Sequence, residues 1–389
     1  MSKAHFAKRT NWNLETNRLA DSLAKRRAAG KPLIDLTESN PTKCGFEYDA
    51  RAILAALAAP ASLKYEPEPK GLEFARQAVS RYYAGRGERV APDDIILTTS
   101  TSEAYSFVFR TLCEPGDEIL IPAPSYPLFE FLGDIQDVKV RRYPLVYDYG
   151  WQIDFRGLET ALTERTRAVI VVHPNNPTGH FCSRAESGKL KEICGSRNLA
   201  LIADEVFLDF SFAGERRHSF ATSDAALTFT LSGISKICGL PQMKFAWLAV
   251  SGPRETKAKT LMRLEIIADT YLSMNAPIQH AAPALLAQRE NFQRQLMVRV
   301  RSNLDELDGQ LNRQKACGRL ELQGGWNAVL RVPATRSDED LAIELLDAKG
   351  VHVHPGHFYD FATEGHVVVS LITAESEFAD GIKALLTMF

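Results

Sequence analysis

The segment ALTFTLSGISKICGLPQMKFAW, residues 226–247, is the starting point for working out the fold. An apolar, β-rich run from Leu227 to Leu231 is followed by a small-residue turn that carries Lys236. A strand that ends in such a turn holds a lysine amine in a fixed place, where the amine can form a Schiff base with a carbonyl group. For this segment alone, the alternative interpretation is a solvated lysine at the end of a strand.

Two further apolar strands upstream end in polar residues. The strand at 168–172 leads into the turn HPNNPTG, which contains Asn176, and the run LALIADEVF carries Asp204 at its end. In open α/β sheets, ligands lie at the carboxyl ends of the strands. The sequence therefore predicts that Asn176, Asp204 and Lys236 meet at one edge of a sheet.

Strands and helical segments alternate along most of the chain, which predicts an α/β fold: a mainly parallel sheet covered by helices on both faces, in three layers. Further apolar strands are expected at 95–97, 118–121, 139–143, 199–203 and 245–250, and helices at 11–30, 50–59, 72–83 and 102–112. From about Pro283 a long charged helix to about Gln314 leads into a strand–helix–strand tail. We place this tail, together with the N-terminal segment, in a smaller domain.

Length and composition are those of an ordinary globular enzyme. The 389 residues are 45% hydrophobic and 24% charged, with a formal net charge of −2, so charge provides no case for nucleic acid or a membrane surface. The six cysteines show no zinc-type spacing, and we expect neither a metal site nor a disulfide framework. The N-terminus has no signal-like apolar region, and no run is long enough to span a bilayer. A cytoplasmic enzyme is expected.

With Asn176, Asp204 and Lys236 in this order, nearly the whole chain resembles the fold-type I pyridoxal-phosphate enzymes, specifically the class I/II aminotransferase-like family. The resemblance implies an aspartate-aminotransferase-like large domain at 45–282 and a smaller α+β domain formed by 1–44 plus 283–389. It also implies pyridoxal 5′-phosphate as cofactor, a small amino acid or amine as substrate, and a homodimer with shared active sites.

The resemblance assigns a role to each residue at the sheet edge. Lys236 would hold the cofactor as a Schiff base and move the proton at the substrate α-carbon, for which a lysine needs a lowered pKa. Asp204 would pair with the protonated pyridine nitrogen, and Asn176 would donate a hydrogen bond to the ring 3′-oxygen. Tyr126, in PAPSYP, would stack on the ring. The alternatives are a helix-capping aspartate, a plain turn and a core tyrosine.

The cofactor phosphate is expected at the hydroxyl cluster of LTTSTSEAY, because a helix N-terminus favours an anion. The cluster comprises Ser100, Thr101 and Ser102, and its alternative interpretation is an ordinary N-cap. Tyr65 matches the tyrosine that reaches the phosphate of the neighbouring subunit. Lys244 stands where the family has a phosphate-binding arginine; lysine supplies charge without the bidentate fork.

Two other positions also depart from the family. Phe207 replaces a tyrosine that donates to the ring oxygen, so we expect a more basic Schiff base. Val368, in GHVVVSLIT, occupies the place of the arginine that binds the substrate carboxylate. The candidate substitutes for this arginine, and for binding at the pocket mouth, are Asn40, Arg331, His354 and His357. For the last three the alternative is a surface or packing role. Thr270 replaces the second arginine of dicarboxylate-specific relatives, which disfavours aspartate and glutamate as donors.

The leading hypothesis is an aminotransferase that moves an amino group between an amino acid and a 2-oxo acid. The alternative keeps the fold and cofactor but performs elimination, cyclisation or oxidation of an amino acid, as in specialised biosynthesis. A third hypothesis, a non-catalytic ligand-sensing domain, lacks the DNA-binding module that such regulators carry. Retention of Lys236, Asp204 and Asn176 also argues against it.

Overall fold

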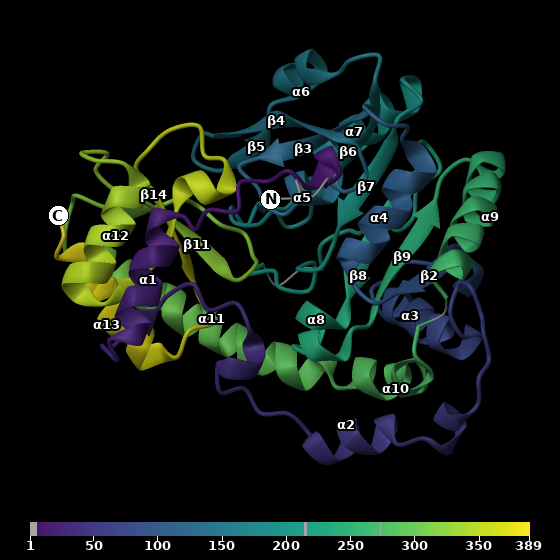
Figure 1. The fold of residues 1–389 in the computed structure, drawn as a ribbon, viewed down its shortest axis with the longest axis horizontal. Helices are drawn as coiled ribbons and strands as arrows, with labels where there is room; N and C mark the ends of the chain where they lie inside the picture. The colour runs from purple at the N-terminus through teal and green to yellow at the C-terminus, as the bar shows by residue number, and fades with distance from the viewer. Residues whose placement is uncertain (1–5, 214–215, 273) are drawn as a thin grey trace, which may run out of the picture.

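An eight-stranded sheet forms the centre of the larger part of the molecule (Figure 1). The computed structural model describes residues 6–213, 216–272 and 274–389. In spatial order the strands are β2 (Ile95–Thr98), β9 (Ala246–Ser251), β8 (Thr228–Gly233), β7 (Ala200–Asp204), β6 (Thr166–Val172), β3 (Glu118–Ala123), β4 (Lys139–Tyr147) and β5 (Trp151–Ile153). Neighbours from β8 to β4 are parallel, and the pairs that involve β9 or β5 are antiparallel. The predicted mainly parallel sheet is confirmed.

The central strands are apolar on both faces, because helices cover both. Along β6, Ile170 and Val172 pack with α4 (Thr101–Leu112) and α9 (Arg254–Tyr271), whereas Val169 and Val171 pack with α7 (Arg184–Ser196). Strands buried on both sides are expected to be continuous Val/Ile/Leu runs rather than alternating patterns. Further helices around this sheet are α2 (Ala50–Leu57), α3 (Glu73–Gly85), α5 (Phe129–Asp134), α6 (Phe155–Ala161) and α10 (Ala276–Ala287).

The register of the central strands places their ends at one level. Val172 of β6 pairs with Asp204 of β7, and Asp204 pairs with Leu231 of β8. The short helix α8 (Ile234–Ile237), which follows β8, carries Lys236. The predicted meeting of the three strand ends at one sheet edge is therefore seen in the structure.

The smaller part of the molecule holds an antiparallel sheet in the order β10 (Gly318–Arg319), β11 (Asn327–Arg331), β14 (His366–Ser370) and β13 (His354–Pro355). Next to it, β1 (Ile34–Asp35) pairs with β12 (Val351–His352). The helices α1 (Arg18–Ala28), α12 (Asp338–Lys349) and α13 (Glu375–Leu386) surround these strands (Figure 1). Single 3-10 turns lie at η1 (Lys8–Thr10), η2 (Pro41–Lys43), η3 (Pro60–Leu63), η4 (Pro92–Asp94), η5 (Pro241–Met243) and η6 (Gly356–Tyr359).

The long helix expected from Pro283 is two helices. Pro283 lies inside α10, and a second helix, α11 (Arg289–Leu311), begins after Gln288. Helix α10 packs on α2 and α3 of the large part, whereas α11 runs on to α13 of the small part (Figure 1). The predicted domain boundary at 282/283 therefore falls within α10 and stays a prediction.

The N-terminal helix is also shorter than the predicted 11–30. It begins at Arg18, because the Asn17 side chain caps it by accepting a hydrogen bond from the Ala20 N–H group. Among the helices of the described ranges, none has both the length and the apolar composition required to cross a membrane.

Candidate active site

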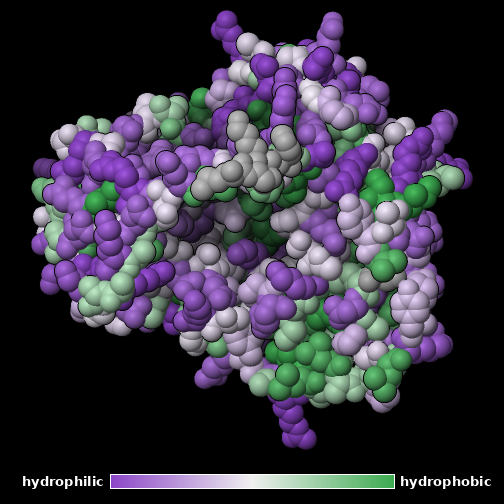
Figure 2. Space-filling model, in the orientation of Figure 1, coloured by the Kyte–Doolittle hydropathy of each residue, from purple (hydrophilic) through white to green (hydrophobic). Residues whose placement is uncertain are grey.

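A cavity of about 470 Å³ lies where the ends of β6, β7 and β8 face the small sheet. Figure 2 shows the hollow between the two parts of the molecule on the face seen in Figure 1. Its lining includes eight of the predicted site residues on the large part, namely Ser100, Thr101, Ser102, Tyr126, Asn176, Asp204, Phe207 and Lys236. Residues far apart in the sequence thus share one cavity.

The Lys236 amine lies among aromatic rings. Its Nζ atom is 4.8 Å from the ring centre of Trp326 and 5.5 Å from that of Phe207. Burial lowers the pKa of Lys236 to about 8, and the charge of Asp204 opposes the shift. A lowered pKa makes more of the amine neutral near physiological pH, which is the form that attacks a carbonyl carbon.

Asp204 is buried at the end of β7. Its carboxylate accepts hydrogen bonds from the Tyr105 hydroxyl (2.9 Å) and the Val206 N–H group (3.1 Å). Burial raises the pKa of Asp204, whereas these two donors and the charge of Lys236 oppose the shift. A buried carboxylate is stabilised by a cation, so this position fits a protonated ring nitrogen.

Asn176 is oriented by a residue that the sequence analysis missed. Its Oδ1 atom accepts a hydrogen bond from Asn327 Nδ2 at 2.7 Å, across from the small sheet. The amide group of Asn176 is therefore left to donate into the cavity. The neighbouring Asn175 has a different role, because its Nδ2 atom donates to the Pro124 carbonyl and to Thr178 Oγ1 and so fixes the turn.

The hydroxyl cluster lies at the N-terminus of α4. Ser100 is the N-cap, and its side chain accepts a hydrogen bond from the Glu103 N–H group at 3.1 Å. Thr101 and Ser102, in the first turn, also line the cavity, where free helix N–H groups suit a phosphate. Both interpretations of the cluster thus hold together: it caps the helix and faces the cavity.

Lys244 and Tyr65 are not part of this lining. Lys244 is exposed, has a left-handed backbone (φ 52°) after η5, and does not face the cavity. Tyr65 is 77% exposed in the loop after η3. Thr270 lies near the end of α9, where its hydroxyl donates to the Ile266 carbonyl. The structure therefore brings none of these three side chains to the cavity of their own chain.

Val368 lies on the cavity-facing side of the small sheet but does not reach the cavity. It pairs with His354 on β13 and with Val329 on β11, and cross-strand partners project from the same face. Val368 is only 1% exposed and packs in one cluster with Tyr359. Its neighbours His354 and Tyr359 do line the cavity.

Of the four substitutes for that arginine, only His354 lines the cavity. Its Nδ1 atom is hydrogen-bonded to the Tyr359 hydroxyl at 2.9 Å. Burial and, to a smaller extent, His352 lower the pKa of His354 to about 4, so the ring is neutral at physiological pH. It can offer a hydrogen bond but no charge.

The other three lie outside the lining. Arg331 is four residues along β11 from Asn327, about 13 Å away at the usual strand rise, and its guanidinium covers the Tyr147 ring at 5.8 Å. Asn40 caps η2 by accepting hydrogen bonds from Thr42. His357 is exposed beside Phe358.

Sequence reasoning missed several lining residues besides Asn327. Tyr105 follows Thr101 by one helical turn, so this spacing could have revealed it. Trp326 and Ser370 come from the small sheet and its loops, and only the tertiary structure brings them to the cavity. No local pattern distinguishes them from core residues.

Comparisons with known proteins agree with this geometry. Residues 31–378 match the family model "Aminotransferase class I and II". An alanine aminotransferase of Mycobacterium bovis is 27% identical over 373 residues, which is 93% of this chain and 86% of that protein. The glutamate-pyruvate aminotransferase AlaA of Escherichia coli is 29% identical over 259 residues, 66% of this chain. That match spans only 64% of the length of the E. coli relative.

Two solved structures share the fold. An aminotransferase from Escherichia coli superimposes with a TM-score of 0.88 at 23% identity, covering 100% of this chain and 98% of that chain. An alanine aminotransferase from Pyrococcus furiosus gives 0.88 at 22% identity, covering 99% of both. The chain belongs to the class I and II aminotransferases, a family of transferase enzymes that use pyridoxal phosphate.

Proposed function

We propose that this protein is a pyridoxal 5′-phosphate-dependent aminotransferase that transfers an amino group between an amino acid and a 2-oxo acid. One observation carries the proposal: a lysine amine with a pKa near 8 shares a single cavity with a buried carboxylate and an oriented amide. When bound, pyridoxal phosphate supplies the electron sink for the carbanion at the substrate α-carbon.

The lining residues fit this cofactor. Lys236 would attach to it and then carry the proton at the α-carbon, which its lowered pKa suits. Asp204, with no cation other than Lys236 close to it among the described lining residues, would hold a proton on the ring nitrogen. Asn176 would donate to the ring oxygen, and the α4 N-terminus would bind the phosphate.

Within the described chain, the cavity lining contains no arginine. A substrate carboxylate would therefore be held by neutral donors, of which His354 and Ser370 lie on the small sheet and Asn176 opposite them. Neutral hydrogen bonds are worth about half of charge-assisted ones. We expect weaker binding of amino acids than a guanidinium provides, and relatives named for alanine, glutamate and pyruvate indicate which substrates to test first.

The same observation favours a second candidate. With this cofactor, the orientation of the substrate selects the bond that breaks. Without a guanidinium to orient the substrate carboxylate, the cavity also suits elimination, cyclisation or oxidation of a specialised amino acid. This candidate and transamination differ in their product: only transamination leaves the cofactor as pyridoxamine phosphate.

We also propose a homodimer with shared sites. Tyr65 is 77% exposed, and so are two large apolar side chains before it in the sequence, Leu63 (94%), two residues away, and Leu54 (62%), on α2. A partner subunit covering this region would bring Tyr65 to the neighbouring cavity.

The test is an absorbance spectrum of the purified protein loaded with pyridoxal phosphate and mixed in turn with each common amino acid. Conversion of the yellow Schiff-base band to the pyridoxamine form, reversed by a keto acid, is the expected result. A yellow protein that no amino acid converts would favour the second candidate. A protein that forms no band would contradict both, and sedimentation of the same sample measures the dimer.

A further inference from the structure

The short helix that carries Lys236 depends on side chains for its stability. Helix α8 has only one turn, so its last carbonyl groups have no partner within the helix. The Ile237 carbonyl, next to Lys236, accepts a hydrogen bond from Gln293 Nε2 at 3.0 Å. The Gly239 carbonyl accepts one from the Tyr48 hydroxyl at 2.8 Å. The position of Lys236 thus depends on residues outside its own segment.

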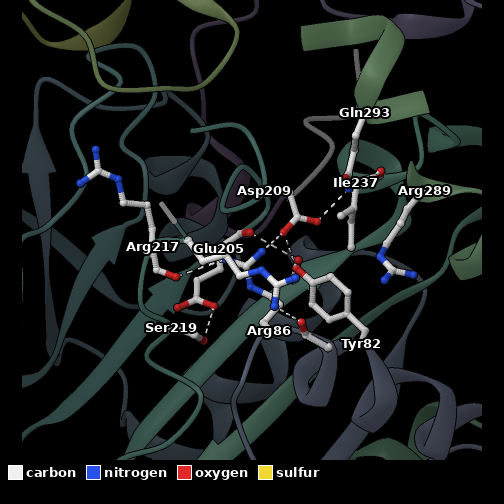
Figure 3. A network of polar contacts seen from close by, with 12 residues as sticks. Tyr82, Arg86, Glu205, Asp209, Arg217, Ser219, Ile237, Arg289 and Gln293 are labelled. Atoms are coloured by element: carbon white, nitrogen blue, oxygen red, sulfur yellow. Dashed lines mark hydrogen bonds and ion pairs between the residues drawn. The ribbon is translucent and has the colours of Figure 1, made fainter. Parts of the chain in front are cut away.

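Gln293 makes a second hydrogen bond with the same nitrogen. Its Nε2 atom donates to Asp209 Oδ2 at 2.8 Å, and Figure 3 shows Gln293 reaching both Asp209 and Ile237. An amide NH₂ group has two protons, so both are used and one rotamer is selected. The side chain is therefore a bridge of defined geometry between two segments.

Asp209 is itself held in a buried network. It accepts a hydrogen bond from the Tyr82 hydroxyl at 3.1 Å and forms an ion pair with Arg86 (Figure 3). The side chains of Asp209 and Arg86 are 6% and 13% exposed. A buried, fully paired carboxylate is a rigid acceptor, because losing any partner leaves a charge uncompensated.

Three segments meet at Gln293. Asp209 lies on the chain that leaves β7 after Asp204, and Ile237 lies on the turn that carries Lys236. Gln293 itself is in the first turns of α11, whose later residues pack against α13 in the small part. The two predicted catalytic residues and the helix that joins the two parts are thus connected through one side chain.

We propose that Gln293 is a positioning residue for Lys236: its amide group ties the Ile237 carbonyl to Asp209 and so holds the lysine turn against α11. This role rests on the proposed function of Lys236. Gln293 touches neither the cavity nor the reacting atoms, so its effect is exerted through the backbone next to Lys236. The competing explanation is that the bridge serves only stability.

Helix α11 offers a matched control. Gln310, near the other end of α11, donates through Nε2 to Glu306 Oε1 at 2.8 Å and to the Ala379 carbonyl at 2.9 Å, so it also bridges a carboxylate and a backbone carbonyl. Gln293→Met and Gln310→Met therefore remove comparable hydrogen bonds from the same helix. Gln293→Lys restores a donor that can reach both acceptors. If Gln293→Met is recovered unfolded, Gln293→Leu, which also has no hydrogen-bonding group and adds no charge beside Asp209, replaces it with the same expectations.

Two readouts are made on each variant. The first is the rate at which pyridoxal 5′-phosphate and borohydride trap Lys236 in cofactor-free protein at pH 8, measured by peptide mass spectrometry. The second is kcat and KM of the amino-transfer half-reaction. For Gln293→Met we expect both trapping and kcat to fall about tenfold, the equivalent of about 1.4 kcal/mol for one hydrogen bond, with KM changed less than about twofold. Gln310→Met stays within about twofold of wild type, and Gln293→Lys recovers most of the loss.

The outcomes separate the two proposals. Equal trapping in Gln293→Met and Gln310→Met would overturn the positioning role while leaving the proposed function intact. Failure of Gln293→Lys to recover trapping would also overturn it, because a donor would then not be what matters. Wild-type protein that is not trapped at Lys236 would refute the proposed function, and the positioning role with it.

Discussion

Replacing Glu205 with glutamine is expected to stabilise the protein increasingly as the pH rises. Glu205 follows Asp204 directly and is only 2% exposed. Its carboxylate accepts hydrogen bonds from the Ser219 hydroxyl (2.7 Å) and the Phe220 N–H group (2.6 Å), of which the first is seen in Figure 3. Burial nevertheless raises the pKa of Glu205 from 4.5 to about 7, although these donors and Arg86 oppose the shift.

The sign and size of this pH dependence follow from the pKa values of Glu205 in the unfolded and the folded protein. A carboxyl group whose pKa is higher in the folded protein contributes its full stability below the unfolded pKa and loses it as the pH rises through the folded pKa. The loss therefore runs from about pH 4.5 to about pH 7. It costs about 1 kcal/mol at pH 5 and about 3 kcal/mol at pH 8, a difference of roughly 2 kcal/mol. Glutamine cannot ionise, so the variant avoids this loss.

The assay is urea unfolding of wild type and Glu205→Gln at pH 5 and pH 8, in cofactor-free protein. Glu192→Gln, at an exposed position of α7, is the reference for the same change on the surface. The stability difference between Glu205→Gln and wild type should shift in favour of the variant by roughly 2 kcal/mol between the two pH values. A shift below about 0.5 kcal/mol would refute the reasoning, because Glu205 would then titrate alike in both states.

Three further predictions concern the cavity. Phe207→Tyr adds a donor to the partly negative ring oxygen, so the Schiff-base pKa should fall by about 1–2 units; identical spectral titrations of variant and wild type would contradict this. In cofactor-free protein, acylation of Lys236 should show a midpoint near pH 8, and a midpoint near the ordinary lysine value would show that the amine is solvated. Tyr105→Phe removes the hydroxyl that donates to Asp204. It should weaken cofactor binding roughly tenfold in equilibrium dialysis, and unchanged affinity would argue against pairing of Asp204 with the ring.

Most of the sheet could be predicted, because each strand can be recognised from its own residues. Runs such as 168–172 and 199–203 are continuously apolar, as strands buried on both faces must be, and parallel pairing then brings their carboxyl ends together. The rule that parallel strands bring their carboxyl ends together was sufficient to predict that Asn176, Asp204 and Lys236 lie close to one another.

The small-sheet side of the cavity could not be predicted in the same way. Asn327 meets Asn176 across 151 residues of sequence, and nothing local in its strand indicates a partner. Arg331 is a candidate from the sequence because it is a cation on the same strand as Asn327. Arg331 does not line the cavity, because it lies four residues along β11 from Asn327, which does. Which end of the strand faces the cavity depends on the tertiary structure.

Helix boundaries were misplaced where a cap competes with an apolar pattern. Leu14 continues the apolar spacing of α1, but the Asn17 side chain starts the helix three residues later. Pro283 was expected to begin a helix and instead lies inside α10, which is closely packed between α2 and α3. Tertiary packing outweighs the local preference of proline in this case.

The pairing of Val368 with His354 constrains how this enzyme's specificity can evolve. A guanidinium at 368 would need the space that His354 and Tyr359 now occupy, so Val368→Arg by itself would overpack a buried position and leave a charge without a partner. A smaller residue at 354 or 359 would have to come first. Substitutions at 368 and at 354 or 359 are therefore epistatic: their order matters, and an arginine at 368 is not accommodated in a single step.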